Sequence, residues 1–168
     1  RLINKNITKP TLIVAKRQTG GRGRIGKKWI SKNGNLFFTI YFCINQKKIN
    51  FKQFAILNAY ILKNLISRKM SKKILIKWPN DLLFENKKFC GILQEVITFN
   101  KLDYLIVGIG INTNTAPQNK SFKSTSLKNI VKKNVSNQKI LKSIIKTYEK
   151  FLKDAEIKSF SELKRKYK

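Results

Sequence analysis

Six short apolar segments constrain the fold of this chain more than any other feature of its sequence. Turn residues separate the later segments, at Pro79-Asn80-Asp81, Glu85-Asn86 and Asn100. Apolar runs bounded by such turns and rich in isoleucine, valine and aromatic residues are typical of β-strands, so the pattern predicts a sheet. The expected strands cover residues 11–16, 35–42, 74–78, 82–85, 87–99 and 103–112.

A different spacing of apolar residues interrupts and follows these strands. Residues 51–68 carry apolar side chains at helical intervals, which predicts an amphipathic helix on the sheet. A polar stretch after Asn114 leads to a second helical stripe over residues 140–152, and a shorter one follows over 160–167. We therefore expect one α+β domain over residues 1–168, with a mixed β-sheet layered with helices.

Histidine is absent from the chain, and this excludes several classes of function. Ser-His-Asp and Cys-His nucleophile systems, His-ligated zinc and the protein-kinase catalytic loop all need it. Cys43 and Cys90 are too few and too far apart for a four-cysteine zinc site or a CxxC redox pair. They indicate a reducing compartment, in which we expect both to be small buried hydrophobic residues.

The formal net charge is +29, from 37 Lys and Arg against 8 Asp and Glu. The basic residues are mostly lysine and are spread along the chain, whereas nucleic-acid-binding proteins favour arginine and a single basic face. Joint enrichment of lysine, asparagine and isoleucine is what an A+T-rich coding sequence produces. In either case the field attracts anions, such as nucleotides or an acidic partner protein, and salt weakens it.

Nothing in the sequence indicates a membrane protein. No apolar run approaches the roughly 20 residues of a membrane span, and residues 1–10 lack the apolar centre of a signal peptide. We expect a soluble, cytoplasmic protein.

A glycine-rich loop follows the first expected strand. Residues 21–26 match G-x-G-x-x-G, but no helix opens within the loop and the first carboxylate side chain is Asp81, which argues against a dinucleotide fold. Guanidinium groups beside exposed backbone amides bind phosphates and carboxylates, and an aromatic ring can cover a base. The alternative is a basic loop whose Trp29 returns to the core. The loop carries Arg22, Arg24, Lys27 and Lys28.

Two motifs place polar groups beside the next strands. Asp81 closes the string Lys77-Trp78-Pro79-Asn80-Asp81, where it either completes an Asx-type turn or anchors Mg²⁺ and orients an incoming amine. Lys88 starts a strand in which Gly91 indicates a bulge or the close approach of a ligand. A solvated lysine is the alternative for Lys88.

The last expected strand ends in alternating glycine and isoleucine, Gly108-Ile109-Gly110-Ile111, followed by Asn112. The small residues line either a ligand slot or a tight contact between strands. In the first case Asn112 is placed to read the edge of a base.

In this order, the strings QTGGRGRIGKKW, KWPNDLLF, KKFCGILQE, VGIGINTN and STSL resemble the catalytic domain of the biotin protein ligase family, the biotin-[acetyl-CoA-carboxylase] ligases. The resemblance covers nearly the whole chain from Leu12 and implies a class II synthetase-like fold. It also implies two steps. Biotin and MgATP give biotinyl-5′-AMP and pyrophosphate, and a lysine of a biotin carboxyl carrier protein then takes the biotinyl group. Neither step needs histidine, because both depend on charge neutralisation and positioning.

The resemblance also implies a role for each site residue. Lys88 and Arg24 stabilise the reacting carboxylate and α-phosphate, while Asp81 lies near the phosphates, the Mg²⁺ and the attacking lysine. Trp29 covers the adenine and Asn112 bonds its edge. The implied biotin-binding residues are Gln18, Gly21, Arg22, Gly23, Arg24, Lys88, Gly91 and Gly108. The implied ATP-binding residues are Arg22, Arg24, Lys27, Trp29, Asn80, Asp81, Lys88 and Asn112.

The sequence departs from the family pattern at several places. Lys27 stands where the family commonly has arginine, and Cys90 where a small residue such as alanine is frequent. No D-S-T-N-like segment precedes Gln18, so we expect the N-terminal segment of the domain to be missing. About 50 residues follow Asn114, too few for the family's C-terminal β-barrel. No N-terminal winged helix is present either, so specific DNA binding is not expected.

Three alternatives remain open, and one of them is a decayed or truncated ligase that retains the fold but not turnover. A lipoate or octanoate protein ligase relative shares the fold and the transfer of an acyl group to lysine, although the GRGRIG and KWPND strings argue against it. A basic nucleic-acid-binding module would bind DNA or RNA with a steep salt dependence and would need no ATP.

Overall fold

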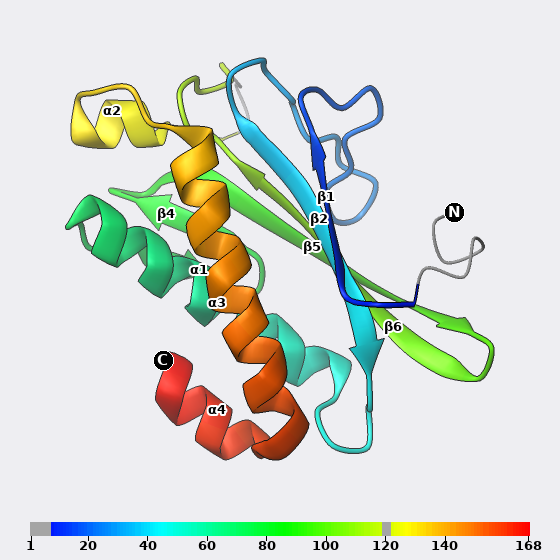
Figure 1. The fold of residues 1–168 in the computed structure, drawn as a ribbon. Helices are drawn as coiled ribbons and strands as arrows, with labels where there is room; N and C mark the ends of the chain where they lie inside the picture. The colour runs from blue at the N-terminus through cyan, green and yellow to red at the C-terminus, as the bar shows by residue number, and fades with distance from the viewer. Residues whose placement is uncertain (1–7, 119–121) are drawn as a thin grey trace.

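A computed structural model, which describes residues 8–118 and 122–168, contains a six-stranded sheet layered with helices (Figure 1). The strands are β1 (Thr11–Ala15), β2 (Leu36–Ile44), β3 (Leu75–Lys77), β4 (Asp81–Phe84), β5 (Lys87–Phe99) and β6 (Leu102–Ile111). Their order in the sheet is β1-β2-β6-β5-β4-β3, and every pairing between them is antiparallel. The predicted α+β class is confirmed, and a parallel bridge joins Lys88 to Ser124.

Three of the helices form a layer on one side of this sheet, in which α1 packs on the strands and on the other two helices (Figure 1). The helices are α1 (Phe51–Met70), α2 (Leu127–Val131), α3 (Asn137–Ile157) and α4 (Phe160–Tyr167), of which α1, α3 and α4 form the layer. Their apolar side chains and the inner face of the sheet make one buried core. The loop between β1 and β2 lies on the opposite side of the sheet, on the face that the helical layer does not cover.

Local signals in the sequence explain where α1 begins and ends. The Asn50 side chain accepts a hydrogen bond from the backbone of Gln53, whose side chain accepts one from the backbone of Asn50. This capping box satisfies two amides that a helix start leaves free. At the other end Ser71 has a left-handed backbone (φ 50°), which stops the helix after Met70.

Two-residue turns fix the register of the two hairpins that carry β4, β5 and β6. Glu85 and Asn86 both have positive φ (48° and 59°), as do Asn100 and Lys101 (49° and 64°). Positive φ at both central residues is the type I′ geometry that matches the twist of antiparallel strands. The turns predicted at these positions are therefore confirmed.

The cysteines behave differently from one another, and the expectation that both are buried is wrong for Cys43. Cys90 is fully buried, and burial raises the pKa of its thiol far above the ordinary value. Cys43 is exposed, because it lies near the end of β2 on the side away from the helices, opposite Tyr104 of β6.

A buried carboxylate joins the two last helices. Asp154 of α3 accepts a hydrogen bond from the Tyr167 hydroxyl (2.8 Å) and forms an ion pair with Lys166, both on α4. Burial raises the pKa of Asp154, but the hydrogen bonds from Lys166 and Tyr167 outweigh it and hold the pKa below its ordinary value. The pair therefore ties α4 to the helical layer.

Within the described residues, no helix is long and apolar enough to cross a membrane.

Candidate active site

A cavity of about 1160 Å³ opens on the face of the sheet that the helical layer leaves free. The β1–β2 loop, the turn before β4, the start of β5 and the end of β6 all contribute to its lining. All of the predicted site residues except Gly21 line it. These are Gln18, Arg22, Gly23, Arg24, Lys27, Trp29, Asn80, Asp81, Lys88, Gly91, Gly108 and Asn112.

Gly21 lies at the base of the glycine-rich loop and has a structural part there. Its carbonyl accepts a hydrogen bond from the Trp29 amide (2.9 Å). A Cβ at this position would come within 2.7 Å of the Trp29 carbonyl oxygen, so only glycine allows the two loop ends to meet.

The glycine-rich loop is a short hairpin. A bridge pairs Arg22 with Lys28, and the Lys27 amide donates to the Arg24 carbonyl (3.2 Å). Ile25, at the tip, has a left-handed backbone (φ 54°) and a side chain that is 90% exposed. A β-branched residue rarely adopts this conformation. An exposed apolar tip over a basic loop suits a segment that closes on a ligand.

Arg22 anchors this hairpin to the sheet. Its guanidinium lies 2.6 Å from the Glu95 carboxylate of β5, in an ion pair whose side chains are 69% and 41% exposed. Sequence reasoning did not identify Glu95, because 73 residues separate the partners and no local pattern links them.

Trp29 lies flat on two glycines of the sheet. Gly91 of β5 and Gly110 of β6 are directly paired across the strands. A Cβ at Gly110 would come within 2.5 Å of the indole, and one at Gly91 within 2.6 Å. The paired glycines therefore make room for the ring. The indole Nε1 is buried and has no hydrogen-bond partner among the described residues, so a ligand that accepts from it would gain a free donor.

Lys88 lines the cavity, where its backbone and its charged group both have partners. Its amide donates to the Lys123 carbonyl, and its carbonyl accepts from the Thr125 amide, both at 2.9 Å. The ammonium lies 2.7 Å from the Asp81 carboxylate, with side-chain exposures of 22% and 17%. The structure thus favours a positioned cation over the solvated lysine considered above.

Two aromatic rings complete the surroundings of the Lys88 ammonium. It lies 5.2 Å from the ring centre of Trp29 and 5.8 Å from that of Phe122. Both distances fall within the range of cation–π attraction. Phe122 was not identified from the sequence, because it belongs to a polar stretch with no apolar periodicity.

Asn112 follows β6 and is 2% exposed. Its side-chain amide donates to the Thr125 carbonyl (3.2 Å), while its own backbone amide donates to the Phe89 carbonyl (2.7 Å). Buried Asn35 supports the same region through hydrogen bonds with the backbone of Thr115. The predicted contact of Asn112 with an adenine edge stays a prediction, for which its amide keeps one further hydrogen.

The carboxylates near the cavity are too few to form a metal site by themselves. Within residues 8–118 and 122–168, no cluster of three or more His, Cys, Asp or Glu could hold a metal. Asp81 begins β4 and is paired with Lys88, while Glu95 is paired with Arg22. Mg²⁺ commonly binds through one or two carboxylates together with substrate phosphates. The donor set therefore fits a Mg²⁺ that arrives with a triphosphate.

Comparison with known proteins gives a consistent result. The profile of the biotin/lipoate A/B protein ligase family matches residues 2–112. "Bifunctional ligase/repressor BirA" of Bacillus subtilis is 30% identical over 97% of this chain and 52% of its own length. The "Biotin--[acetyl-CoA-carboxylase] ligase" of Paracoccus denitrificans is 31% identical over 62% of this chain and 45% of its own. The chain thus spans about half the length of these relatives.

Among solved structures, "Biotin protein ligase from Aquifex aeolicus in complex with biotin and ATP" has a TM-score of 0.80 and 34% identity. The match covers 96% of this chain and 68% of that one. The similarity extends through the sheet, the helical layer and the elements that line the cavity.

Proposed function

The chain belongs to the biotin/lipoate A/B protein ligase family, and we propose that its reaction is the ATP-dependent attachment of biotin to a lysine of a biotin carboxyl carrier protein. The observation that carries this proposal is the placement of Lys88. Its ammonium is largely buried, is paired with Asp81 and lies in a cavity lined by the basic glycine-rich loop. Such a site neutralises a carboxylate and a phosphate held side by side.

In the first step, an oxygen of the biotin carboxylate attacks the α-phosphorus of ATP. The new O–P bond forms biotinyl-5′-AMP, and the bond to the β-phosphate breaks to release pyrophosphate. Two anions must approach each other, so catalysis needs fixed positive charge more than proton transfer. We assign this part to Lys88 and Arg24, with Arg22 and Lys27 at the phosphates.

In the second step, the amine of the carrier lysine attacks the carbonyl carbon of the mixed anhydride. A C–N bond forms, the C–O bond to AMP breaks, and the amine loses a proton. The Asp81 carboxylate is at hand to orient the amine and to take that proton. Its present partner is the Lys88 ammonium, 2.7 Å away.

The remaining proposed contacts come from the resemblance to biotin protein ligases, and all of these residues line the one cavity. We assign Gln18, Gly23, Gly91 and Gly108 to the biotin ring. We assign Trp29, Asn80 and Asn112 to the nucleotide, with Asp81 as protein ligand to its Mg²⁺. The loop that carries Arg24 and Ile25 would then close over the adenylate, because water hydrolyses a mixed anhydride.

The acceptor we propose is the biotin carrier domain of acetyl-CoA carboxylase or of another biotin-dependent carboxylase, with the reaction taking place in the cytoplasm. The name of the Paracoccus relative supports the first of these. Two widely separated thiols and the absence of a paired cysteine motif are consistent with a reducing compartment.

The test is biotin-dependent exchange between ATP and radiolabelled pyrophosphate, because it isolates the first step and needs no carrier protein. We expect exchange with biotin and none above background with lipoate or octanoate. Exchange only with lipoate or octanoate would replace this proposal with the related ligase. The absence of exchange with all three acids would refute adenylation by this chain.

A further inference from the structure

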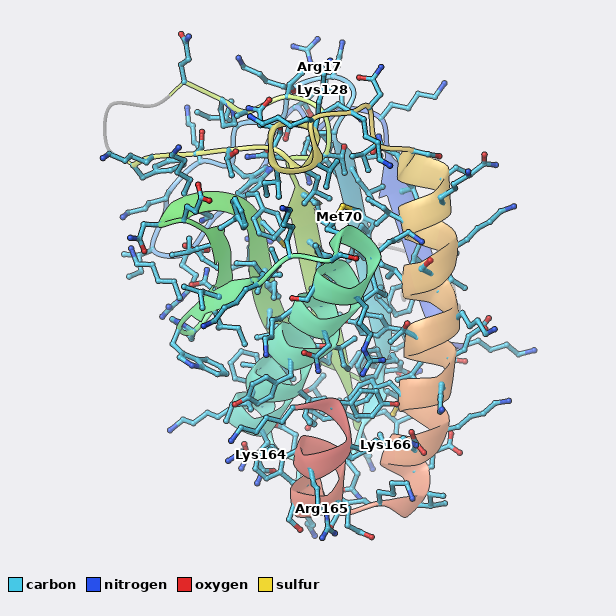
Figure 2. All side chains as sticks on the ribbon, turned by 90° about the vertical axis from the view of Figure 1, so that its left-hand side faces the viewer. Arg17, Met70, Lys128, Lys164, Arg165 and Lys166 are labelled. Atoms are coloured by element: carbon cyan, nitrogen blue, oxygen red, sulfur yellow. The ribbon has the colours of Figure 1, made fainter. Side chains whose placement is uncertain are left out.

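The carboxylates of the chain are distributed unevenly over the fold. No Asp or Glu occurs in residues 1–80 or 104–148, so α1, α2 and the first half of α3 carry none. Asp154, Glu156 and Glu162 lie toward the far end of the helical layer. Figure 2 places Met70, at the end of α1, beside the first turns of α3, and Lys164, Arg165 and Lys166 at the opposite end of the molecule. The helices that meet near Met70 therefore contribute lysines and no carboxylate to that end.

This positive end contains a second cleft, of about 620 Å³, between the end of α1 and the connection from α2 to α3. Its apolar residues include Ile130 and Ile140, which are 7% and 1% exposed, and no carboxylate lines it among the described residues. The Lys69 ammonium is fixed by a hydrogen bond to the Ser143 hydroxyl (2.9 Å). The lysines that line the cleft are Lys69, Lys72, Lys132, Lys133 and Lys139.

A short segment of the chain connects the cleft to the catalytic cavity. The Thr125 amide binds the Lys88 carbonyl, and the Leu127 amide, at the start of α2, binds the Asn112 carbonyl. Ile130 of the cleft comes five residues after Thr125, so their Cα atoms lie within about 18 Å of each other. An acceptor domain of about 80 residues has a radius of gyration of about 12 Å. Such a domain is wide enough to reach both places at once.

The charge of this chain sets a condition on any lysine acceptor. The acceptor amine approaches as an ammonium, whereas the enzyme carries a net charge of +29. The approach is repulsive unless the acceptor also carries carboxylates that meet positive charge on the enzyme. The cleft lies near Lys88, is lined by lysines and has no carboxylate among its described residues, so it supplies the positive charge that such an acceptor needs.

We propose that the cleft lined by Lys69, Lys72, Lys132, Lys133 and Lys139 docks an acidic segment of the acceptor protein, whose lysine then enters the catalytic cavity. This inference rests on the proposed function. The apolar floor suits a peptide with carboxylates flanking an aliphatic side chain. Among the residues that the structure describes, neither aromatic rings nor arginine line the cleft, so these residues offer no stacking platform or guanidinium fork of the kind that favours nucleic acid.

The test compares two double variants with the same change in net charge. Lys72→Glu/Lys133→Glu reverses one lysine on each side of the cleft, and both positions are exposed. Lys150→Glu/Lys153→Glu reverses two exposed lysines in the second half of α3, away from the cleft. The substrate is a purified biotin carrier domain of the source organism's acetyl-CoA carboxylase, at saturating biotin and MgATP and at low and high salt.

We expect the cleft variant to raise the KM for the carrier domain about tenfold or more at low salt, with kcat within twofold of the parent. We expect the control variant to raise KM less than threefold, and both to keep parental biotin-dependent pyrophosphate exchange. High salt should reduce the difference between the two variants. Equal effects of both variants, or none, would overturn the docking proposal.

Two further outcomes separate this proposal from the others. If parental exchange is absent, the proposed function fails, and binding of the carrier domain by fluorescence anisotropy still compares the two variants. If the cleft variant loses affinity for a labelled single-stranded oligonucleotide but not for the carrier domain, the cleft belongs to nucleic acid and the proposal is overturned.

Discussion

Replacing Gly110 with alanine should detach Trp29 from the sheet without unfolding the domain. The new Cβ would lie 2.5 Å from indole Cε2, 2.6 Å from Nε1 and 2.7 Å from Cζ2. Non-bonded carbon atoms prefer about 3.5–4.0 Å, so the ring has to move by about 1 Å. A gap of that size forfeits about a quarter to a half of the dispersion attraction between indole and sheet.

The question is which part of the protein yields. Overpacking commonly costs about 1–3 kcal/mol. If the sheet took this cost, Tm would fall by about 2–12 °C for a chain of this size. Trp29 belongs to an exposed hairpin and Gly110 to a buried pair of strands, so we expect the hairpin to yield and Tm to change by less than about 2 °C.

The assay follows Trp29 directly. Trp78→Phe removes the only other tryptophan of the chain, so the remaining fluorescence reports Trp29. In this background Gly110→Ala should shift the emission to longer wavelength and increase quenching by acrylamide. Gly108→Ala is the matched control, because its Cβ would meet only the Leu93 carbonyl oxygen at 3.6 Å and the Thr39 hydroxyl at 4.0 Å. An unchanged Trp29 spectrum with a lowered Tm would refute the reasoning.

Three other predictions concern charged groups. Lys88→Ala should lower biotin-dependent pyrophosphate exchange by at least about 100-fold, since by our proposal it removes the main charge stabiliser, while circular dichroism stays native. Glu95→Gln frees Arg22 from an exposed pair worth at most about 1 kcal/mol, so the KM for biotin in exchange should rise by no more than about fivefold. Asp154 has a lowered folded-state pKa, so its stabilisation is complete above about pH 5 and is lost as the pH falls through 3.8 and below. Asp154→Asn should therefore lower stability to urea more at pH 7 than at pH 3.

Much of the fold could be predicted because its signals are local. Asn50 starts α1, and Glu85-Asn86 and Asn100 form the turns that set the register of β4, β5 and β6. Helix α2 was not predicted separately within the helical tail, since five residues give no apolar period. It is held by the Ser126 cap and by backbone bonds to Asn112 and Thr113, which only the folded sheet supplies.

The site was predictable as a set of residues and less so as a set of contacts. The resemblance, which rests on the order of the motifs, implied that Lys88, Asp81 and Trp29 share one site, and all three line the same cavity. The seat of Trp29 on the Gly91–Gly110 pair depends on the register between β5 and β6, which a list of motifs does not contain. Glu95 was missed for the same reason, because its partnership with Arg22 arises only when the loop folds back on β5.

The pairing of β2 with β6 has a consequence for folding. Leu36 lies opposite Ile111 and Ile44 opposite Asp103, so the centre of the sheet joins segments that are distant along the chain. Closing such long loops costs entropy before any contact compensates it, which makes folding slow in proteins of this kind. During synthesis β2 therefore cannot complete its pairing with β6 until residue 111 has left the ribosome. Biotin and ATP, which by our proposal bind the completed sheet, should then shift the equilibrium toward the folded state by mass action.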